Sequence, residues 1–216
     1  MFRTGMLLAV SVKLLMVSTA VVAAQSAVPL AGSCKSPITI SAKDDAALRD
    51  AFNRARGSVR LVFLVDPICP GCLRGLKDLD TAVLTPLATE ASLQTFIVHT
   101  PVLGATEADT ANTCGLVHNE HVVHYWDPKQ DMGTLFAKAE NMKKGDQLVY
   151  AWDVWLIYAP DAEWTGAEPP KSAFVMHQLE DLMKRADFPY LNAPLFRAEV
   201  DKQLRMVAAS QKPATP

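Results

Sequence analysis

Two cysteines three positions apart, Cys69 and Cys72, are the residues of this sequence best suited to chemistry. A thiolate attacks a disulfide and a thiol does not, yet a free cysteine with a pKa of about 8.5 is mostly protonated at neutral pH. Cys69 stands just before a predicted helix, and Pro70 fits the first helical position, where its missing N–H is not needed. The free amides and positive dipole end of that helix would stabilise a Cys69 thiolate.

The spacing assigns a different role to each cysteine. Cys69 is the predicted nucleophile, and Cys72, at the start of the buried helix face, is the predicted resolving thiol. The Cys69 thiolate would attack a protein disulfide to give a mixed disulfide, which Cys72 then displaces. Gly71 leaves the rim of the site open to a large substrate. We expect no organic cofactor, and we expect protein thiols or disulfides and a redox partner protein as partners.

A strand and a helix must position this pair. Residues 59–65 are almost all β-branched or apolar, which predicts a central strand covered on both faces. Asp66 and Pro67 end the strand, and the cysteine motif follows directly. Beyond it, apolar residues recur at helical spacing from Cys72 to Val83, so the helix begins at the motif.

The other predicted elements alternate between strands and helices. They are a strand at 38–40, a helix carrying Leu48, Phe52 and Ala55, a strand at 93–98, a helix at 132–142, a strand within 148–158 with a hairpin partner near Trp164, a helix carrying Val175, Leu179, Leu182 and Ala186, and an extra C-terminal helix at 194–209. The less regular residues 103–146 form an insertion in the middle. This order predicts an α/β fold with a central mixed sheet flanked by helices.

The strand, the C-x-x-C motif and the helix resemble those of the thioredoxin superfamily. The resemblance rests on residues 61–72, Leu-Val-Phe-Leu-Val-Asp-Pro-Ile-Cys-Pro-Gly-Cys, and the element order supports it over roughly 35–186. It implies a thioredoxin-like fold and thiol–disulfide oxidoreductase activity. The chain also resembles a bacterial branch of exported C-x-x-C proteins, through Trp126-Asp127 and the Ala-Trp-Asp sequence at 151–153.

One position departs from the superfamily pattern. Its oxidoreductases usually carry a cis-proline just before the strand that faces the cysteines, and if that strand is 154–158, Asp153 stands in the proline's place. A carboxylate there would raise the pKa of the Cys69 thiol by charge repulsion, or it would accept the proton of Cys72. The missing proline also weakens the usual barrier to metal binding at the cysteine pair.

Two other functions fit the same motif. In a metal-binding protein, such as a copper or zinc carrier, both thiolates would bind the metal together with Asp153 or a histidine. In a non-catalytic binding module the cysteines would form an inert disulfide. We favour the oxidoreductase, with no resident metal, because the motif lies between a strand and a helix.

The histidines offer only a weak indication of a metal site. His118, His121 and His124 repeat every three residues, as ligands on one helix face do, but a polar loop with surface histidines is the favoured interpretation. His177 is expected to pack on a C-terminal helix or to face solvent, and His99 ends a strand.

The first residues predict a secretory signal at 1–24. Arg3 and Lys13 accompany a largely apolar run at 14–24, which is shorter than the roughly 20 residues that span a bilayer. A cut after Ala24 is favoured over an uncleaved membrane anchor. The expected location is the periplasm or the outside of the cell, with membrane contact only during export.

The mature chain is expected to hold one domain. A flexible lead at 25–34 precedes a thioredoxin-like domain at 35–209, and a disordered tail follows at 210–216. Export would bring the two remaining cysteines, Cys34 and Cys114, into an oxidising compartment, where they either form a structural disulfide or stay as buried free thiols. The formal charge of −2 on 216 residues, without a basic block, does not indicate a nucleic-acid partner.

Overall fold

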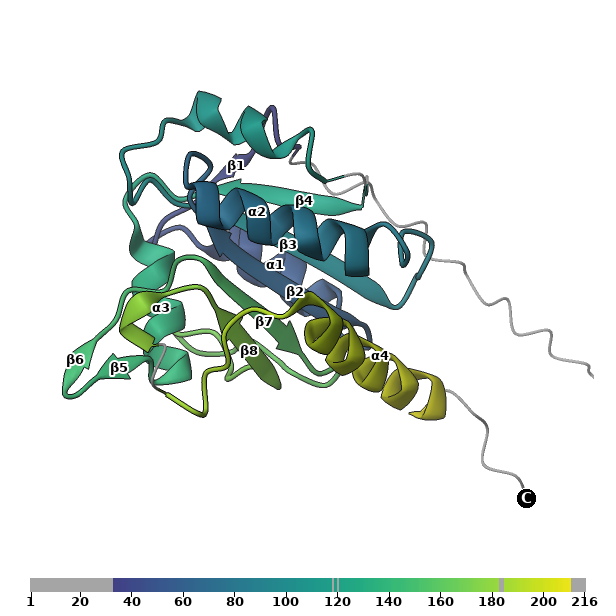
Figure 1. The fold of residues 1–216 in the computed structure, drawn as a ribbon. Coiled ribbons are helices and arrows are strands. Elements are labelled where there is room, and N and C mark those ends of the chain that lie inside the picture. Colours follow the sequence, from purple (N-terminus) through teal and green to yellow (C-terminus); the bar gives the residue numbers. More distant parts are fainter. Residues whose placement is uncertain (1–32, 118, 120, 183–184, 211–216) are drawn as a thin grey trace, which may run out of the picture.

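A six-stranded mixed sheet between two layers of helices forms the body of the molecule (Figure 1). The computed structural model describes residues 33–117, 119, 121–182 and 185–210. The predicted signal at 1–24, nearly all of the lead at 25–34 and nearly all of the tail at 210–216 lie outside these residues. None of the described helices is both long enough and apolar enough to cross a membrane.

The strand that leads to the cysteine motif lies inside the sheet, whose order is β1-β4-β3-β2-β7-β8. The strands are β1 (Ile38–Thr39), β2 (Val59–Val65), β3 (Leu93–His99), β4 (Val122–Trp126), β7 (Val154–Tyr158) and β8 (Phe174–His177). β2 is buried along its whole length and pairs parallel to β3 and antiparallel to β7. The predicted central strand at 59–65 is therefore confirmed.

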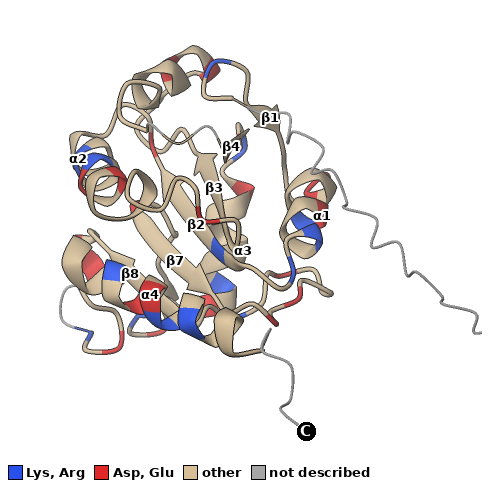
Figure 2. Cartoon of the chain, turned by 90° about the vertical axis from the view of Figure 1, so that its right-hand side faces the viewer, with Lys and Arg blue, Asp and Glu red and all other residues tan. Residues whose placement is uncertain are grey.

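Helices cover both faces of the sheet. They are α1 (Ala46–Arg54), α2 (Pro70–Leu79), α3 (Asp131–Glu140) and α4 (Ala193–Ser210), with short helical turns η1 (Asp80–Leu84), η2 (Glu107–Thr113) and η3 (Glu180–Leu182). Figure 2 shows α2 and α4 on one side of the sheet and α1 on the other. Alternate residues of β2 enter the two cores, since Val62 packs with Phe52 of α1, whereas Phe63 packs with Leu76 of α2 and Phe196 of α4.

These elements make a thioredoxin-like α/β fold, as predicted. The parallel unit β2-α2-β3 is followed by the antiparallel pair β7-β8 and a closing helix, α4. Along the chain, strand β4 and helix α3 come between β3 and β7, together with a small hairpin of β5 (Lys143–Lys144) and β6 (Gln147–Leu148). The helix predicted at 132–142 is confirmed as α3.

Two predictions after residue 158 are wrong. The residues predicted as a helix from Val175 onward form strand β8 and the turn η3, because Phe174, Val175 and Met176 alternate between the two cores. The hairpin partner of β7 is therefore β8, not a strand near Trp164. Trp164 instead packs edge-on against Phe52 and Phe136.

Strand β4 was not predicted from the sequence, and it carries one member of a buried histidine pair. His124 lies inside β4, where its Nδ1 is 3.0 Å from Nε2 of His99 and the two rings stack. The prediction of a surface loop is thus wrong for His124. It holds for His121, which is exposed, and the third histidine, His118, lies outside the described residues. His177 lies buried in β8, not on a helix, where its Nδ1 accepts from the N–H of Leu179.

A disulfide joins the segment before β1 to the end of η2. Cys34 and Cys114 are bonded, with their Cα atoms 5.5 Å apart. The hydroxyl of Thr110 supports the same contact by donating to the carbonyl of Cys34. The closed loop contains β1, α1, β2, α2 and β3, so the strand and helix that carry the cysteine motif lie inside it.

Removing this disulfide should destabilise the fold. The two cysteines are 80 residues apart, and opening such a loop restores entropy to the unfolded chain worth about 4 kcal/mol. We expect urea unfolding of the Cys34→Ser/Cys114→Ser variant to show a loss of this size. The single variant Cys34→Ser should lose about as much, and a double variant as stable as the unchanged protein would contradict the prediction.

Acid should weaken the fold through the histidine pair. Burial lowers the pKa of His124 to about 4, and burial together with His124 lowers the pKa of His99. The unfolded chain takes up these protons near pH 6.5 and the folded chain does not. The free energy of unfolding should therefore fall between pH 6.5 and 4, by up to about 3 kcal/mol for His124.

Urea unfolding across this pH range measures the effect. His124→Gln should flatten the fall, because the glutamine does not titrate. The matched control, His121→Gln, changes an exposed side chain and should keep the dependence of the unchanged protein. Equal pH dependence in all three proteins would show that the buried pair is not responsible.

Candidate active site

The N-terminus of α2 places Cys69 where the sequence predicts it. Cys69 is the N-cap residue with extended backbone, and Pro70 is the first residue of the helix. Sγ of Cys69 accepts a hydrogen bond from the N–H of Cys72 at 3.3 Å. The free amide of the first helical turn is thus aimed at the sulfur, as stabilisation of a thiolate requires.

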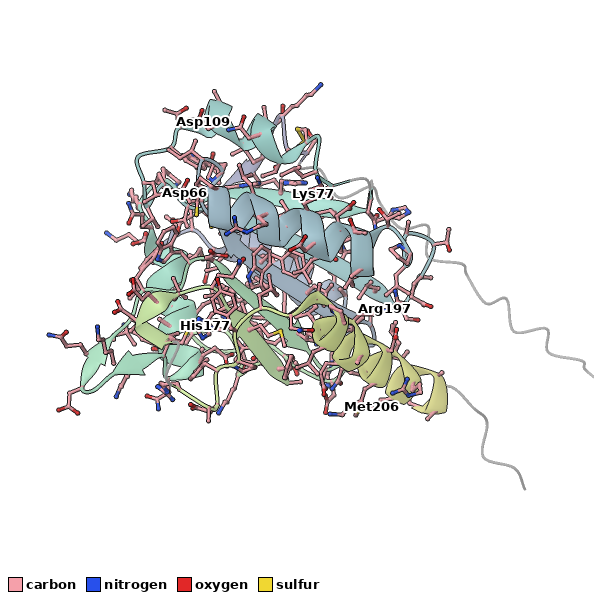
Figure 3. All side chains as sticks on the ribbon, viewed as in Figure 1. Asp66, Lys77, Asp109, His177, Arg197 and Met206 are labelled. Atoms are coloured by element: carbon pink, nitrogen blue, oxygen red, sulfur yellow. A yellow bond between two sulfur atoms is a disulfide. The ribbon has the colours of Figure 1, made fainter. Side chains whose placement is uncertain are left out.

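Asp66 fixes the turn that carries the chain from β2 to α2. Figure 3 shows Asp66 at the N-terminal end of α2. Its carboxylate accepts from the N–H groups of Ile68 and Leu103, at 2.9 and 2.6 Å, and its carbonyl accepts from the N–H of Cys69 at 3.1 Å. The sequence suggested only that Asp66 ends a strand. Asp66 also joins the motif to the loop after β3, and this could not be predicted because its partner, Leu103, is 37 residues away in the sequence.

The two cysteines are unequally accessible. Both carry free thiols; Cys69 keeps 7% of its surface exposed and Cys72 is fully buried beneath it. Cys72 begins the apolar face of α2, in the same core cluster as Leu76 and Trp155. Cys69 is therefore the more accessible of the two, and its sulfur lies 3.3 Å from the backbone nitrogen of Cys72.

The surroundings of the two thiols also shift their pKa values in opposite directions. The hydrogen bond from Cys72 lowers the pKa of Cys69 to about 6, against the opposing effect of burial, and the backbone N–H groups of Cys72 and Gly71 lower it further. Burial raises the pKa of Cys72 far above its ordinary value, and the hydrogen bond that it gives to Cys69 raises it further. At neutral pH the pair therefore carries one negative charge, held on Cys69.

Asp153 reaches the cysteines from the other side. It directly precedes β7 and has a left-handed backbone, with φ of 52°. One carboxylate oxygen and the two sulfurs all lie within 4.8 Å of one another. Burial raises the pKa of Asp153 to about 7, the charge on Cys69 raises it too, and a hydrogen bond from Cys72 opposes the rise. A carboxylate in this place can take the proton that Cys72 gives up.

Gly71 leaves the space between these groups open. A Cβ at this position would lie 3.1 Å from Oδ2 of Asp153 and 3.6 Å from Sγ of Cys69. A larger residue would therefore crowd the Asp153 carboxylate and fill the space beside the Cys69 sulfur. Within the described ranges, one group of three or more histidine, cysteine or acidic side chains is close enough to hold a metal ion, and it consists of Cys69, Cys72 and Asp153.

Exposed apolar residues lie on the two segments that Asp66 joins beside the cysteine motif. Ile68 precedes Cys69 and is 37% exposed, and Leu103, tied to Asp66 through its N–H, is 51% exposed. Trp152, which precedes Asp153, is half-buried and lines a pocket beside the β5–β6 hairpin. The other tryptophans, Trp126, Trp155 and Trp164, are buried.

The topology and the cysteine pair at the start of α2 define a thioredoxin-like protein with a C-x-x-C site. No family model matches the chain, and no curated protein matches it.

Solved structures similar to this chain share little sequence with it. A secreted disulfide oxidoreductase of Mycobacterium tuberculosis, described as homologous to Escherichia coli DsbE, is 10% identical over 69% of this chain and 84% of its own, with a TM-score of 0.42. A thiol:disulfide interchange protein of the thioredoxin family from Chlorobium tepidum is 9% identical over 76% and 90%, with a TM-score of 0.44. Copper-bound ScoI of Arabidopsis thaliana is 10% identical over 71% and 88%, also with a TM-score of 0.44.

Two replacements of Cys72 should separate its hydrogen bond from its reactivity. Cys72→Ser keeps a donor beside the Cys69 sulfur, whereas Cys72→Ala removes it, and that bond is the largest cause of the lowered pKa of Cys69. We expect the rate of alkylation of Cys69 by iodoacetamide to rise with pH around a midpoint of about 6 in the unchanged, reduced protein. The midpoint should stay low in Cys72→Ser and rise in Cys72→Ala. Identical midpoints in the two variants would contradict this origin of the shift.

Proposed function

We propose that this protein is an exported thiol–disulfide oxidoreductase that acts on protein substrates, with Cys69 as nucleophile and Cys72 as resolving thiol. The observation that carries the proposal is that Cys69 and Cys72 differ both in accessibility and in pKa. The sulfur at the helix N-cap is both the accessible one and the one with the lowered pKa, and its neighbour is buried and protonated.

The reaction follows from this difference. The Cys69 thiolate attacks one sulfur of a substrate disulfide, and the other substrate sulfur leaves as a thiolate that takes up a proton. Cys72 then loses its proton and attacks the Cys69 sulfur, which forms the Cys69–Cys72 disulfide and releases the second substrate thiol. Two electrons pass from the cysteine pair to the substrate. A redox partner protein returns the pair to its dithiol, and the same steps in reverse oxidise a substrate.

The surroundings of Cys69 favour a protein substrate over a small thiol. Ile68, next to Cys69 in the chain, and Leu103 carry exposed apolar side chains, and the carboxylate of Asp66 holds the backbone N–H of each. An apolar segment of a substrate chain can cover this surface while its disulfide meets Cys69.

Two observations support a location in the periplasm or outside the cell. The first residues have the pattern of a cleaved secretory signal. The described part of the chain contains a disulfide, Cys34–Cys114, that does not involve the reactive pair, and such bonds persist in oxidising compartments.

A redox titration tests the chemistry. Incubation with mixtures of reduced and oxidised glutathione, followed by acid quenching, alkylation and mass spectrometry, should show Cys69 and Cys72 gaining and losing two electrons together. Cys34 and Cys114 should remain bonded throughout, which makes them an internal control. A Cys69–Cys72 pair that never changes state with glutathione or dithiothreitol would overturn the proposal.

Trapping tests the substrate class. Cys72→Ser cannot resolve a mixed disulfide, so it should accumulate covalent complexes with proteins of its own compartment that dithiothreitol releases. Cys69→Ser is the matched control and should trap none. Failure of Cys72→Ser to capture any protein, with the pair still redox-active, would favour a binding module without protein substrates.

A further inference from the structure

The reduced site contains a third group that could bind a metal ion, a carboxylate, beside the two sulfurs that disulfide exchange requires. Two thiol sulfurs and a carboxylate oxygen lie within 4.8 Å of one another, and all three side chains are at least nine-tenths buried. They come from two elements, since Cys69 and Cys72 belong to the start of α2 whereas Asp153 precedes β7. The sheet therefore holds the set together independently of any bound group.

The separations suit a small tetrahedral cation. With metal–sulfur bonds of about 2.3 Å and metal–oxygen bonds of about 2.0–2.2 Å, tetrahedral ligand atoms lie roughly 3.5–4 Å apart. The present separations exceed these by about 1 Å at most, which side-chain rotation can supply.

The carboxylate has unused binding capacity. Asp153 is 4% exposed, and its Oδ1 is buried with no hydrogen bond of standard geometry among the described residues, although the Trp155 side chain, whose own Nε1 is likewise unpaired, interacts with this carboxylate and lowers its pKa. A buried carboxylate oxygen in this condition is costly unless a donor or a cation meets it. Its other oxygen, Oδ2, faces the space that Gly71 leaves open beside Cys69. A cation between the three side chains would satisfy the carboxylate and neutralise the thiolates.

The ligand types select among metals. Two thiolates disfavour magnesium and calcium, which prefer oxygen ligands throughout. Copper(I) prefers soft sulfur ligands and gains little from a carboxylate. Zinc(II) binds thiolate and carboxylate together in four-coordinate sites, and three protein ligands leave its fourth position open.

We propose that Cys69, Cys72 and Asp153 bind one zinc(II) ion when the cysteine pair is reduced. The step forms two Zn–S bonds and one Zn–O bond, releases the proton of Cys72 and any proton still held by Cys69 or Asp153, and changes no oxidation state. This binding goes beyond the oxidoreductase activity and competes with it, because the metal-bound Cys69 sulfur is no longer a free nucleophile. Formation of the Cys69–Cys72 disulfide removes two of the three ligands and abolishes the site.

Metal titration of the full chain tests this inference. Reduced protein, with the Cys34–Cys114 disulfide intact, is titrated with Zn(II) against a chromophoric chelator, and Co(II) serves as a spectroscopic probe. We expect one ion per chain, sulfur-to-cobalt charge-transfer absorption with the intense visible bands of a tetrahedral site, and protection of Cys69 from alkylation. Protein with an oxidised Cys69–Cys72 pair should bind no ion.

A substitution at Asp153 tests the three-ligand assignment. Asparagine tolerates the left-handed backbone at this position, so Asp153→Asn should fold, which urea unfolding checks. It should weaken Zn(II) binding at least tenfold, whereas the control Asp161→Asn, at an exposed acid beyond β7, should bind as the unchanged protein does.

Three results would overturn the inference: no one-to-one complex, binding that survives oxidation of the pair, or equal affinity in Asp153→Asn and Asp161→Asn. None of these affects the glutathione titration of the cysteine pair, which requires no metal. A failure of zinc binding is therefore distinguishable from a failure of the proposed oxidoreductase function.

Discussion

The contact between the start of α2 and the Cys69 sulfur is the interaction on which the rest of the site depends. The N–H of Cys72 points at that sulfur from the first turn of the helix, and the Cys72 thiol donates to it as well. One sulfur thereby becomes a stable anion, and the other becomes a proton donor with a raised pKa. Identical residue types acquire opposite properties because one caps a helix and the other lies within it.

The remainder of the fold keeps that contact in place. Burial of β2 on both faces fixes the end of the strand, and Asp66 then ties the following turn both to Cys69 and to the loop beyond β3. From the opposite side, β7 brings Asp153 to the same point, although no local signal relates residue 153 to residue 69. The geometry of the site therefore depends on the pairing of β2 with β7.

The parts of the structure that follow from local pattern could be predicted from the sequence. The continuous β-branched and apolar run at 59–65 and the helical spacing after Cys72 are both clear local signals, so β2, α2 and the capping role of Cys69 were predictable. β4 was not, because His124 interrupts an otherwise apolar strand and its partner in the core, His99, belongs to a different strand. β8 was missed because Val175, Leu179 and Leu182 have helical spacing, whereas the pairing of β8 with β7 decides its structure.

The Cys34–Cys114 bond also bears on how the chain reaches its native state. Four cysteines can form two bonds in three ways, and only one of them joins Cys69 to Cys72. Cys34 and Cys114 are the competitors that could divert either member of the reactive pair during oxidative maturation. Once they are joined to each other, the remaining two sulfurs have no partner left within the chain except one another, and their bond can open and close repeatedly without scrambling.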